Sequence, residues 1–502
     1  MFRMTTFFTA PAFVVLMAGT AHAALTADQV WQSWKDAGAT AGLTVSAATE
    51  NKDGGSLTLN GVLIVPTGAA SGLTISDMVL TEEADGSVTI TPGADIAVDL
   101  AGEGTAGSVK LTHEGLMLKA SEGDGGALVY DYGAKTLNLA FDSSYPATSF
   151  DGSDAGKATS NGTVGFTDLT GVYSDTPGTN RTFGFDIAAS KLSYNVVTAD
   201  PGMKTKTTST SETADVAIAL DAAMPATMSL FAIAAPGDFG TALQEGLSLS
   251  MSTKQGTSIG TASMEDEVFP YNMAINAGPG EATGVFNKDA FDIQSKGEGL
   301  SLEMTSTALP LPVKITSGPV VFGMTSPVMA KDAAAPYAFI MKLSQFTVNE
   351  EAWAMVDPGG ALKRDPADLA IDVSGMAKID FIDLMAAEET GATPAMPAPE
   401  TLDIKEMTLK IAGAAFMGTG AFTFDNSMGV PMPLGEANVS LTGGNALIDG
   451  LIATGMVTEE DAMGARMMMG AFMSPGAEPD SLTSKIEAKA GGEIYVNGQR
   501  VQ

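Results

Sequence analysis

Cysteine is absent from the 502 residues, histidine occurs twice, and charged residues make up only 17% of the chain. Without cysteine there is no disulfide framework, no zinc ribbon, no iron–sulfur cluster and no thiol nucleophile. Cations are scarce, 26 Lys and Arg against 59 Asp and Glu, and a formal charge of −33 is unsuited to binding nucleic-acid phosphates. With 45% hydrophobic residues the chain is too apolar to be disordered, so we expect a folded protein without a nucleic-acid partner.

The first 23 residues have the pattern of a secretory signal peptide. Arg3 provides a positive start, Phe7–Met17 is an apolar run, and Ala21–Ala23 fits the small-x-small cleavage site. The run is too short to span a bilayer, which takes ~20 apolar residues. We therefore expect cleavage after Ala23, a periplasmic location and no transmembrane segment in the mature chain. That chain would carry 25 Lys and Arg against 59 acids, a net −34.

Alternating apolar and polar residues run through most of the chain, which is typical of half-buried strands. Val88 and Ile90 share one face of such a run, and glycine-containing turns such as Gly278–Gly280 separate the runs. Tight turns join antiparallel strands and cannot make parallel crossovers. The predicted fold class is therefore mainly β: long, meandering antiparallel sheet, curved or groove-like, with a few short capping helices.

Four helices stand out from this pattern. A capping box at Thr26–Gln29 opens the first, and 237–246 and 349–356 each read as a single short helix. Thr458 caps the last, which runs from Glu459 to Met473.

We expect two β-rich halves in the mature chain. The first covers 24–245 with its short N-terminal helix, and the second covers 246–502 with short helices near 349–357 and 459–473. One continuous unit is the alternative division.

Several enzyme-like patterns fail on context. Gly256–Gly260 places Ser258 in a nucleophile-elbow pattern, but that chemistry needs a later histidine, and none follows His113. A hairpin between the flanking runs is the favoured interpretation. Gly102–Gly107 matches the dinucleotide pattern but precedes a strand instead of a helix, and Gly152–Lys157 is one residue short of a phosphate-binding loop. Both are expected to be turns.

Metal and acid–base sites are also disfavoured. His113 is the only mature histidine and makes a poor transition-metal site alone, so we expect a surface residue facing away from Leu111. Weak calcium binding at Asp151–Asp154 stays open, although its spacing fits no known loop. Adjacent acid pairs such as Glu82–Glu83 point to opposite faces of a strand, which does not suit a glycosidase.

A methionine cluster surrounds Arg466. Thioethers bind Cu(I), but Met463, Met467 and Met468 stand at helical spacing, so we expect them to pack the last helix onto a sheet. No catalytic, cofactor-binding or metal-binding residue is assigned, and no cofactor is expected.

The segment 353–375, WAMVDPGGALKRDPADLAIDVSG, resembles an uncharacterised family of exported alphaproteobacterial proteins, domain of unknown function 2125. Residues 25–47 and 75–91 are similar to that family too, as is the close of the chain from 450 onward, so the resemblance covers nearly all of the mature sequence. Lys363 departs from the proline expected there. The family brings no reaction. In this segment Arg364 is expected among three acids, Asp357, Asp365 and Asp368, pinning a turn that holds Trp353 against the sheet.

The close of the chain is also similar, less specifically, to exported envelope proteins related to the AsmA group, long sheets implicated in lipid handling. That similarity is a fold-level analogy. The expected function is a non-enzymatic envelope protein that binds lipid or another apolar ligand along a β-sheet groove. The alternative is a structural or protein-interaction protein of the envelope without a small-molecule ligand. An exposed, contiguous apolar groove distinguishes the first from the second.

Overall fold

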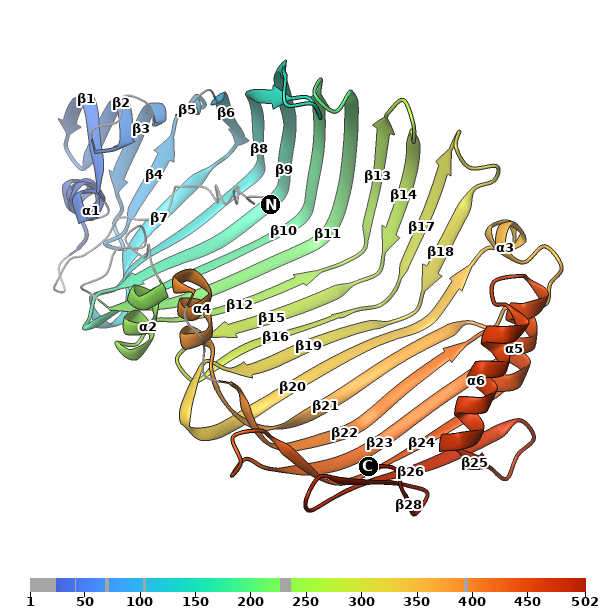
Figure 1. The fold of residues 1–502 in the computed structure, drawn as a ribbon. Coiled ribbons are helices and arrows are strands. Elements are labelled where there is room, and N and C mark those ends of the chain that lie inside the picture. Colours follow the sequence, from blue (N-terminus) through green and yellow to red (C-terminus); the bar gives the residue numbers. More distant parts are fainter. Residues whose placement is uncertain (1–23, 41, 68–71, 103–104, 226–235, 392–395) are drawn as a thin grey trace. The chain divides into compact units, whose positions relative to one another are not determined.

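The structure is a computed structural model that describes residues 24–40, 42–67, 72–102, 105–225, 236–391 and 396–502. The chain divides into two units. The first contains the described part of Met1–Ala234 together with Glu245–Leu247, and the second contains Ala235–Gln244 and Ser248–Gln502. Figure 1 labels most elements of both units.

The first unit is an antiparallel sheet with one α-helix. Its elements are α1 (Ala27–Thr40), β1 (Leu43–Asp53), β2 (Ser56–Pro66), β3 (Leu73–Glu82), β4 (Val88–Pro92), β5 (Ile96–Gly102), β6 (Thr105–Glu114), β7 (Met117–Glu122), a single 3-10 turn (Asp124–Gly126), β8 (Leu128–Thr148), β9 (Asp154–Thr176), β10 (Asn180–Asp200) and β11 (Thr205–Pro225). β1, β2 and β3 pair in order, β3 pairs with both β4 and β5, and β8 to β11 pair in order.

The predicted capping box opens α1. The amide of Thr26 donates to Gln29 Oε1 at 2.8 Å, and the amide of Gln29 donates back to Thr26 Oγ1 at 3.3 Å. The apolar side of α1 then lies on the sheet and contributes Val30, Trp31 and Trp34 to a cluster with strand residues from β1 to β10. A true hydrophobic core therefore exists where α1 covers the sheet.

Tyrosines of β8 and β9 extend this core. Tyr130 receives a hydrogen bond from Trp34 Nε1 at 3.3 Å, and its ring lies 6.2 Å from that of Tyr173. Burial raises the pKa of both hydroxyls above the ordinary value, because the charged phenolate would lose its hydration. Ionising either hydroxyl is therefore even less favourable than in water, so both rings belong to the core as neutral groups.

The second unit has most of the helices. Its elements are α2 (Pro236–Gln244), β12 (Ser248–Gln255), β13 (Ser258–Glu265), β14 (Tyr271–Ala277), β15 (Gly280–Phe286), β16 (Ala290–Gly297), β17 (Leu300–Ser306), β18 (Val313–Ser317), β19 (Val320–Pro327), β20 (Met329–Val348), α3 (Glu350–Val356), β21 (Ala367–Asp380), α4 (Phe381–Thr390), β22 (Ala398–Ile411), β23 (Ala414–Asp425), β24 (Met432–Thr442), α5 (Gly444–Ala453), α6 (Glu459–Phe472), β25 (Ser474–Pro475), β26 (Ser481–Lys489), β27 (Glu493–Val496) and β28 (Gln499–Arg500).

The predicted fold class is confirmed: both units are antiparallel sheet with few helices. Helices lie where the sequence predicts them at 237–246, 349–356 and 459–473, and Thr458 Oγ1 accepts from the amide of Asp461 at 3.2 Å as a cap. The helix α4 was not predicted. Asp380 caps it through the amide of Asp383 at 3.0 Å.

The predicted hairpin at Gly256–Gly260 is wrong. β12 pairs with β15 and β13 with β14, and one uninterrupted register relates the two pairs: Gln255 lies opposite Gly280, and Ser258 lies opposite Ala277. β12 and β13 are thus two halves of one long strand. The predicted turn at Gly278–Gly280 is likewise an interruption within the neighbouring long strand, since β14 and β15 continue the same alignment.

Proline explains these interruptions. Pro279 and Pro319 have no amide hydrogen, so the ladder cannot continue through them. Neighbouring backbone groups use the proline carbonyls instead: the amide of Glu298 donates to Pro279 O at 2.9 Å, and the amide of Ser344 donates to Pro319 O at 3.2 Å. β18 and β19 are the last pair of such short strands, and both pair with the single long strand β20. β18 pairs with one end of β20, and β19 pairs further along it. From there β20, β21, β22, β23, β24 and β26 pair in order.

Candidate apolar binding face

Four rows of side chains cross the sheet of the second unit from β19 to β26. Residues directly opposite each other in paired strands share a face, and so do residues two apart in one strand. We call the surface made by these rows the apolar face. Its rows are Val320, Leu343, Leu369, Leu409, Phe416, Leu441, Leu482; Phe322, Met341, Ile371, Met407, Gly418, Val439, Ser484; Met324, Phe339, Val373, Ile404, Gly420, Ala437, Ile486; and Tyr337, Gly375, Leu402, Phe422, Gly435, Ala488.

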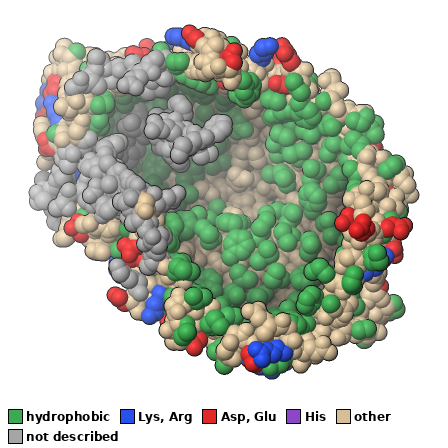
Figure 2. All heavy atoms as spheres, viewed as in Figure 1, with side chains coloured by type: hydrophobic (Ala, Val, Ile, Leu, Met, Phe, Trp, Pro, Cys, Tyr) green, Lys and Arg blue, Asp and Glu red, His purple; other side chains and the backbone are tan. Residues whose placement is uncertain are grey.

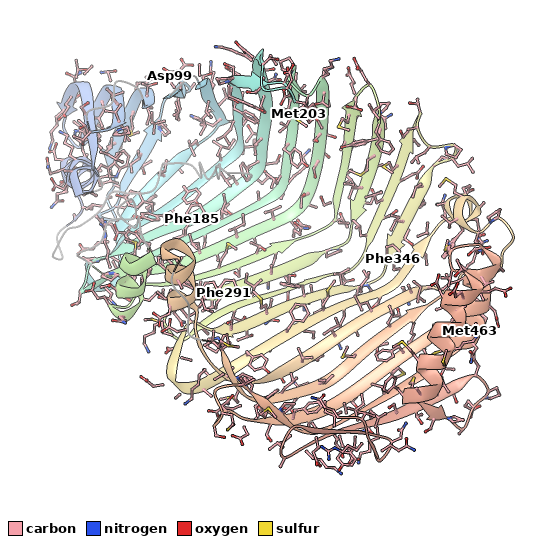
Figure 3. All side chains as sticks on the ribbon, in the orientation of Figure 1. Asp99, Phe185, Met203, Phe291, Phe346 and Met463 are labelled. Atoms are coloured by element: carbon pink, nitrogen blue, oxygen red, sulfur yellow. The ribbon has the colours of Figure 1, made fainter. Side chains whose placement is uncertain are left out.

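Bulges keep these residues on one side. In β22, Ile404 and Met407 are three residues apart instead of two, and the register against β21 shifts between Asp372 and Val373, which leaves Lys405 as the extra residue. In β20 the register shifts between Leu343 and Phe346. Without such insertions the alternation would turn every later apolar side chain to the opposite side. Figure 3 labels two of the apolar side chains in this sheet, Phe346 of β20 and Phe291 of β16.

The opposite side of these strands is polar, and so is the same side of β15 and β16, where Lys296 lies opposite Val321 of β19. We call this side the polar face. Ion pairs join its strands at short range. They are Glu281–Lys296 at 2.9 Å, Lys342–Glu406 at 2.8 Å, Asp368–Lys410 at 3.2 Å and Glu436–Lys485 at 2.7 Å. Lys342 Nζ donates to Glu406 and lowers the pKa of that carboxyl. Water therefore has favourable partners on the polar face, whereas the two hydroxyls in the rows of the apolar face, those of Tyr337 and Ser484, already donate to backbone carbonyls.

The apolar face is substantially exposed although no charged side chain lies in its rows. Met341 and Met407 are each 37% exposed, and Leu409 is 45% exposed. Figure 2 shows hydrophobic side chains gathered on the viewed side over β19 to β24, where the surface is hollowed. A sheet covered by a second layer would bury such residues below a tenth of their surface, as α1 does for its cluster in the first unit.

Helices lie at the two ends of these strands. At one end Phe239 of α2 stacks 5.3 Å from Phe286, whose ring lies 6.2 Å from Phe291. At the other end Ser484 Oγ donates to the carbonyl of Phe472 in α6 at 2.7 Å, so α6 reaches the apolar face at β26. The helices border the apolar face and leave the middle of β20 to β22 uncovered.

A pinned turn after α3 supports the border. The buried Asp357 accepts hydrogen bonds from the amides of Leu362 and Ala361, each at 2.9 Å, and the first of these, above all, lowers the pKa of the carboxyl. Leu362 is buried, and its side chain faces Gly450 of α5, where any added Cβ would lie 2.7 Å away. The turn thereby holds α5 at the end of the strands.

The predicted surroundings of Arg364 are partly wrong. Arg364 does pair with Asp357 at 3.5 Å and lies over the Trp353 ring at 5.4 Å. Its nearest carboxylate is Glu350 at 2.9 Å, whereas Asp368 pairs with Lys410. Asp368 belongs to β21 and its side chain follows the polar face, a direction that sequence proximity does not reveal.

His113 was also predicted wrongly. It is half-buried on the same side of β6 as the buried Leu111, because residues two apart in a strand share a face. Nδ1 accepts from the amide of Leu116 at 3.3 Å, which leaves the proton on Nε2 to donate to Gly93 O at 3.1 Å. Both ring nitrogens therefore serve the backbone of a turn and are not poised for acid–base work.

The methionine prediction fails as well. Met463, Met467 and Met468 are 62% to 69% exposed, and the residue that α6 buries is Ala462. Helical spacing identified a stripe but not the side on which it lies. In the described part of the chain, no three His, Asp or Glu side chains group as a metal site, and Asp151 instead accepts from Ser153 of its own turn.

The remaining patterns lie in strands and turns. Ser258 begins β13, and Gly102 ends β5, with positions 103–104 outside the described residues. Gly152 precedes β9 in a turn. Among the described helices, none combines the length and apolar character that crossing a membrane requires.

Comparison with known proteins finds a match to a family model within the second unit. Residues 281–492 match the family model described as "Uncharacterized protein conserved in bacteria" (DUF2125). No curated protein matches the chain. The matched segment begins in β15 and ends just before β27, so it contains the whole of the apolar face and the helices α3 to α6.

Proposed function

We propose that this protein binds the acyl chains of lipids on the apolar face, as a non-enzymatic protein of the bacterial cell envelope. The observation that carries the proposal is the uncovered apolar face between β19 and β24, bordered by helices and backed by a charged polar face. Burying apolar surface stabilises by roughly 25 cal/mol per Å², so an acyl chain over these rows would gain substantial free energy.

The location belongs to the same proposal. The N-terminal pattern with cleavage after Ala23 supports export to the periplasm, and the similarity of the closing segment to AsmA-related proteins agrees with a role in the envelope. The chemistry is binding without catalysis, since the lone mature histidine is committed to backbone groups.

A protein partner is the second candidate function. The exposed methionines of α6 favour it, because flexible thioethers are common at adaptable protein interfaces. A structural or protein-interaction role would leave the apolar face without a small ligand.

Lipid extraction from the protein isolated without detergent tests the proposal. We expect mass spectrometry to find one or more acyl lipids per chain in near-stoichiometric amount. A protein that is folded, free of lipid and unable to take up a fluorescent fatty alcohol would refute acyl-chain binding. Co-purification of one protein in equal amount would then support the second candidate.

A further inference from the structure

The distribution of charge on the second unit bears on the class of lipid. In the rows of the apolar face, which lie wholly among described residues, no position is charged. The lysines of β16, β20, β22 and β26 that form cross-strand ion pairs lie on the polar face. An anionic group brought to the apolar face would lose hydration without gaining a cation.

Two arginines at the border of the apolar face are already paired with acidic groups. Arg364 pairs with Glu350 at 2.9 Å and donates to Asp357 O at 3.0 Å, and Arg466 of α6 pairs with Asp449 of α5 at 2.5 Å. Proteins that hold phosphate or carboxylate headgroups usually present arginine in an open fork. The chain also carries a formal charge of −33, which repels anions at long range.

The rows of the apolar face are long enough for an extended acyl chain that lies across the strands. Seven strands contribute to each of the first three rows, and six intervals of roughly 4.8 Å give a row about 29 Å long. The acyl chains of one leaflet occupy about half of a ~30 Å hydrocarbon core. A row can therefore accommodate the full length of an extended acyl chain.

We propose that the apolar face selects uncharged long-chain lipids, such as acylglycerols or fatty alcohols, over anionic ones, because it offers apolar contact along its rows and no cation within those rows to pair with a headgroup. This proposal rests on acyl-chain binding as the function of the same face. It adds that selection depends on the absence of positive charge.

Competition between two ligands that have the same hydrocarbon chain but different headgroups tests the selectivity for uncharged lipids. Oleyl alcohol and oleate would each displace a pyrene-labelled fatty alcohol from the full protein at pH 8, in 50 mM and in 500 mM NaCl. We expect the alcohol to compete at least tenfold more strongly at low salt. High salt should narrow this gap without closing it, because salt screens the long-range repulsion but does not supply a cation to the face.

A cation placed on the apolar face provides the converse test. Leu409→Lys should raise oleate binding relative to oleyl alcohol by at least tenfold. The matched control is Met417→Lys, because Met417 is 51% exposed but lies on the polar face of the neighbouring β23, and this variant should leave the ratio unchanged. Oleate that competes as well as the alcohol in the unaltered protein would overturn the selectivity and leave acyl binding intact. Failure of the labelled alcohol to bind at all would overturn both.

Discussion

Replacing Met341 and Met407 together by glutamine is expected to weaken binding of a fluorescent fatty alcohol at least tenfold. The two residues stand in one row, with Ile371 between them, and each is 37% exposed on the apolar face. An amide pressed against an acyl chain without a hydrogen-bond partner costs about 1–3 kcal/mol, and about 1.4 kcal/mol corresponds to tenfold in affinity. Titration of the labelled alcohol into each variant measures the effect.

The control for this pair is Met417→Gln. It makes the same chemical change at an exposed methionine one strand away, on the polar face, and should leave the affinity within twofold of the unaltered protein. Because all three methionines are partly in water, the variants should unfold at nearly the same denaturant concentration. Equal losses from the apolar-face pair and from Met417→Gln would contradict binding at the apolar face.

Trp34→Ala is expected to destabilise the first unit by about 3–5 kcal/mol, the usual cost of removing a large aromatic side chain from a core. Trp34 is buried, meets the Trp31 ring edge-to-face at 6.1 Å and donates to Tyr130, so its loss leaves both a cavity and a hydroxyl without that donor. Urea unfolding followed by the remaining tryptophan fluorescence and circular dichroism measures the change.

Gln32→Ala in the same helix is the matched control. Gln32 is exposed, and its side chain donates to Asp36 on the surface of α1. Its replacement should change the free energy of unfolding by less than about 0.5 kcal/mol. A loss of less than about 1 kcal/mol for Trp34→Ala would show that α1 does not pack on the sheet as described.

The mainly-β antiparallel architecture was predictable because period-two alternation and glycine turns run through the whole chain. Pairing partners were not. Gly256 and Gly278 resemble hairpin turns in sequence, but each interrupts one long strand, because the decision depends on which strand lies alongside. A turn signal in the sequence indicates where the hydrogen-bonded ladder is interrupted. It does not show whether the chain reverses direction there or continues as the same strand.

The apolar face was only partly foreseeable. Alternation reveals that one side of each strand is apolar, but not whether another layer covers it. Bulges obscured the pattern further, since Ile404 and Met407 share a face at a spacing of three. Met463 shows the reverse failure: its helical spacing suggested burial, yet nothing in the sequence of α6 fixed which side would meet the sheet.

Photo-crosslinking with a diazirine-labelled fatty alcohol would show directly where on the protein the bound acyl chain lies. Acyl-chain binding on the apolar face predicts adducts concentrated on apolar-face residues of β20 to β22, around Met341 and Leu409, and their loss when unlabelled oleyl alcohol is in excess. Adducts confined to the polar face or to α6, or a pattern that excess oleyl alcohol does not change, would contradict it.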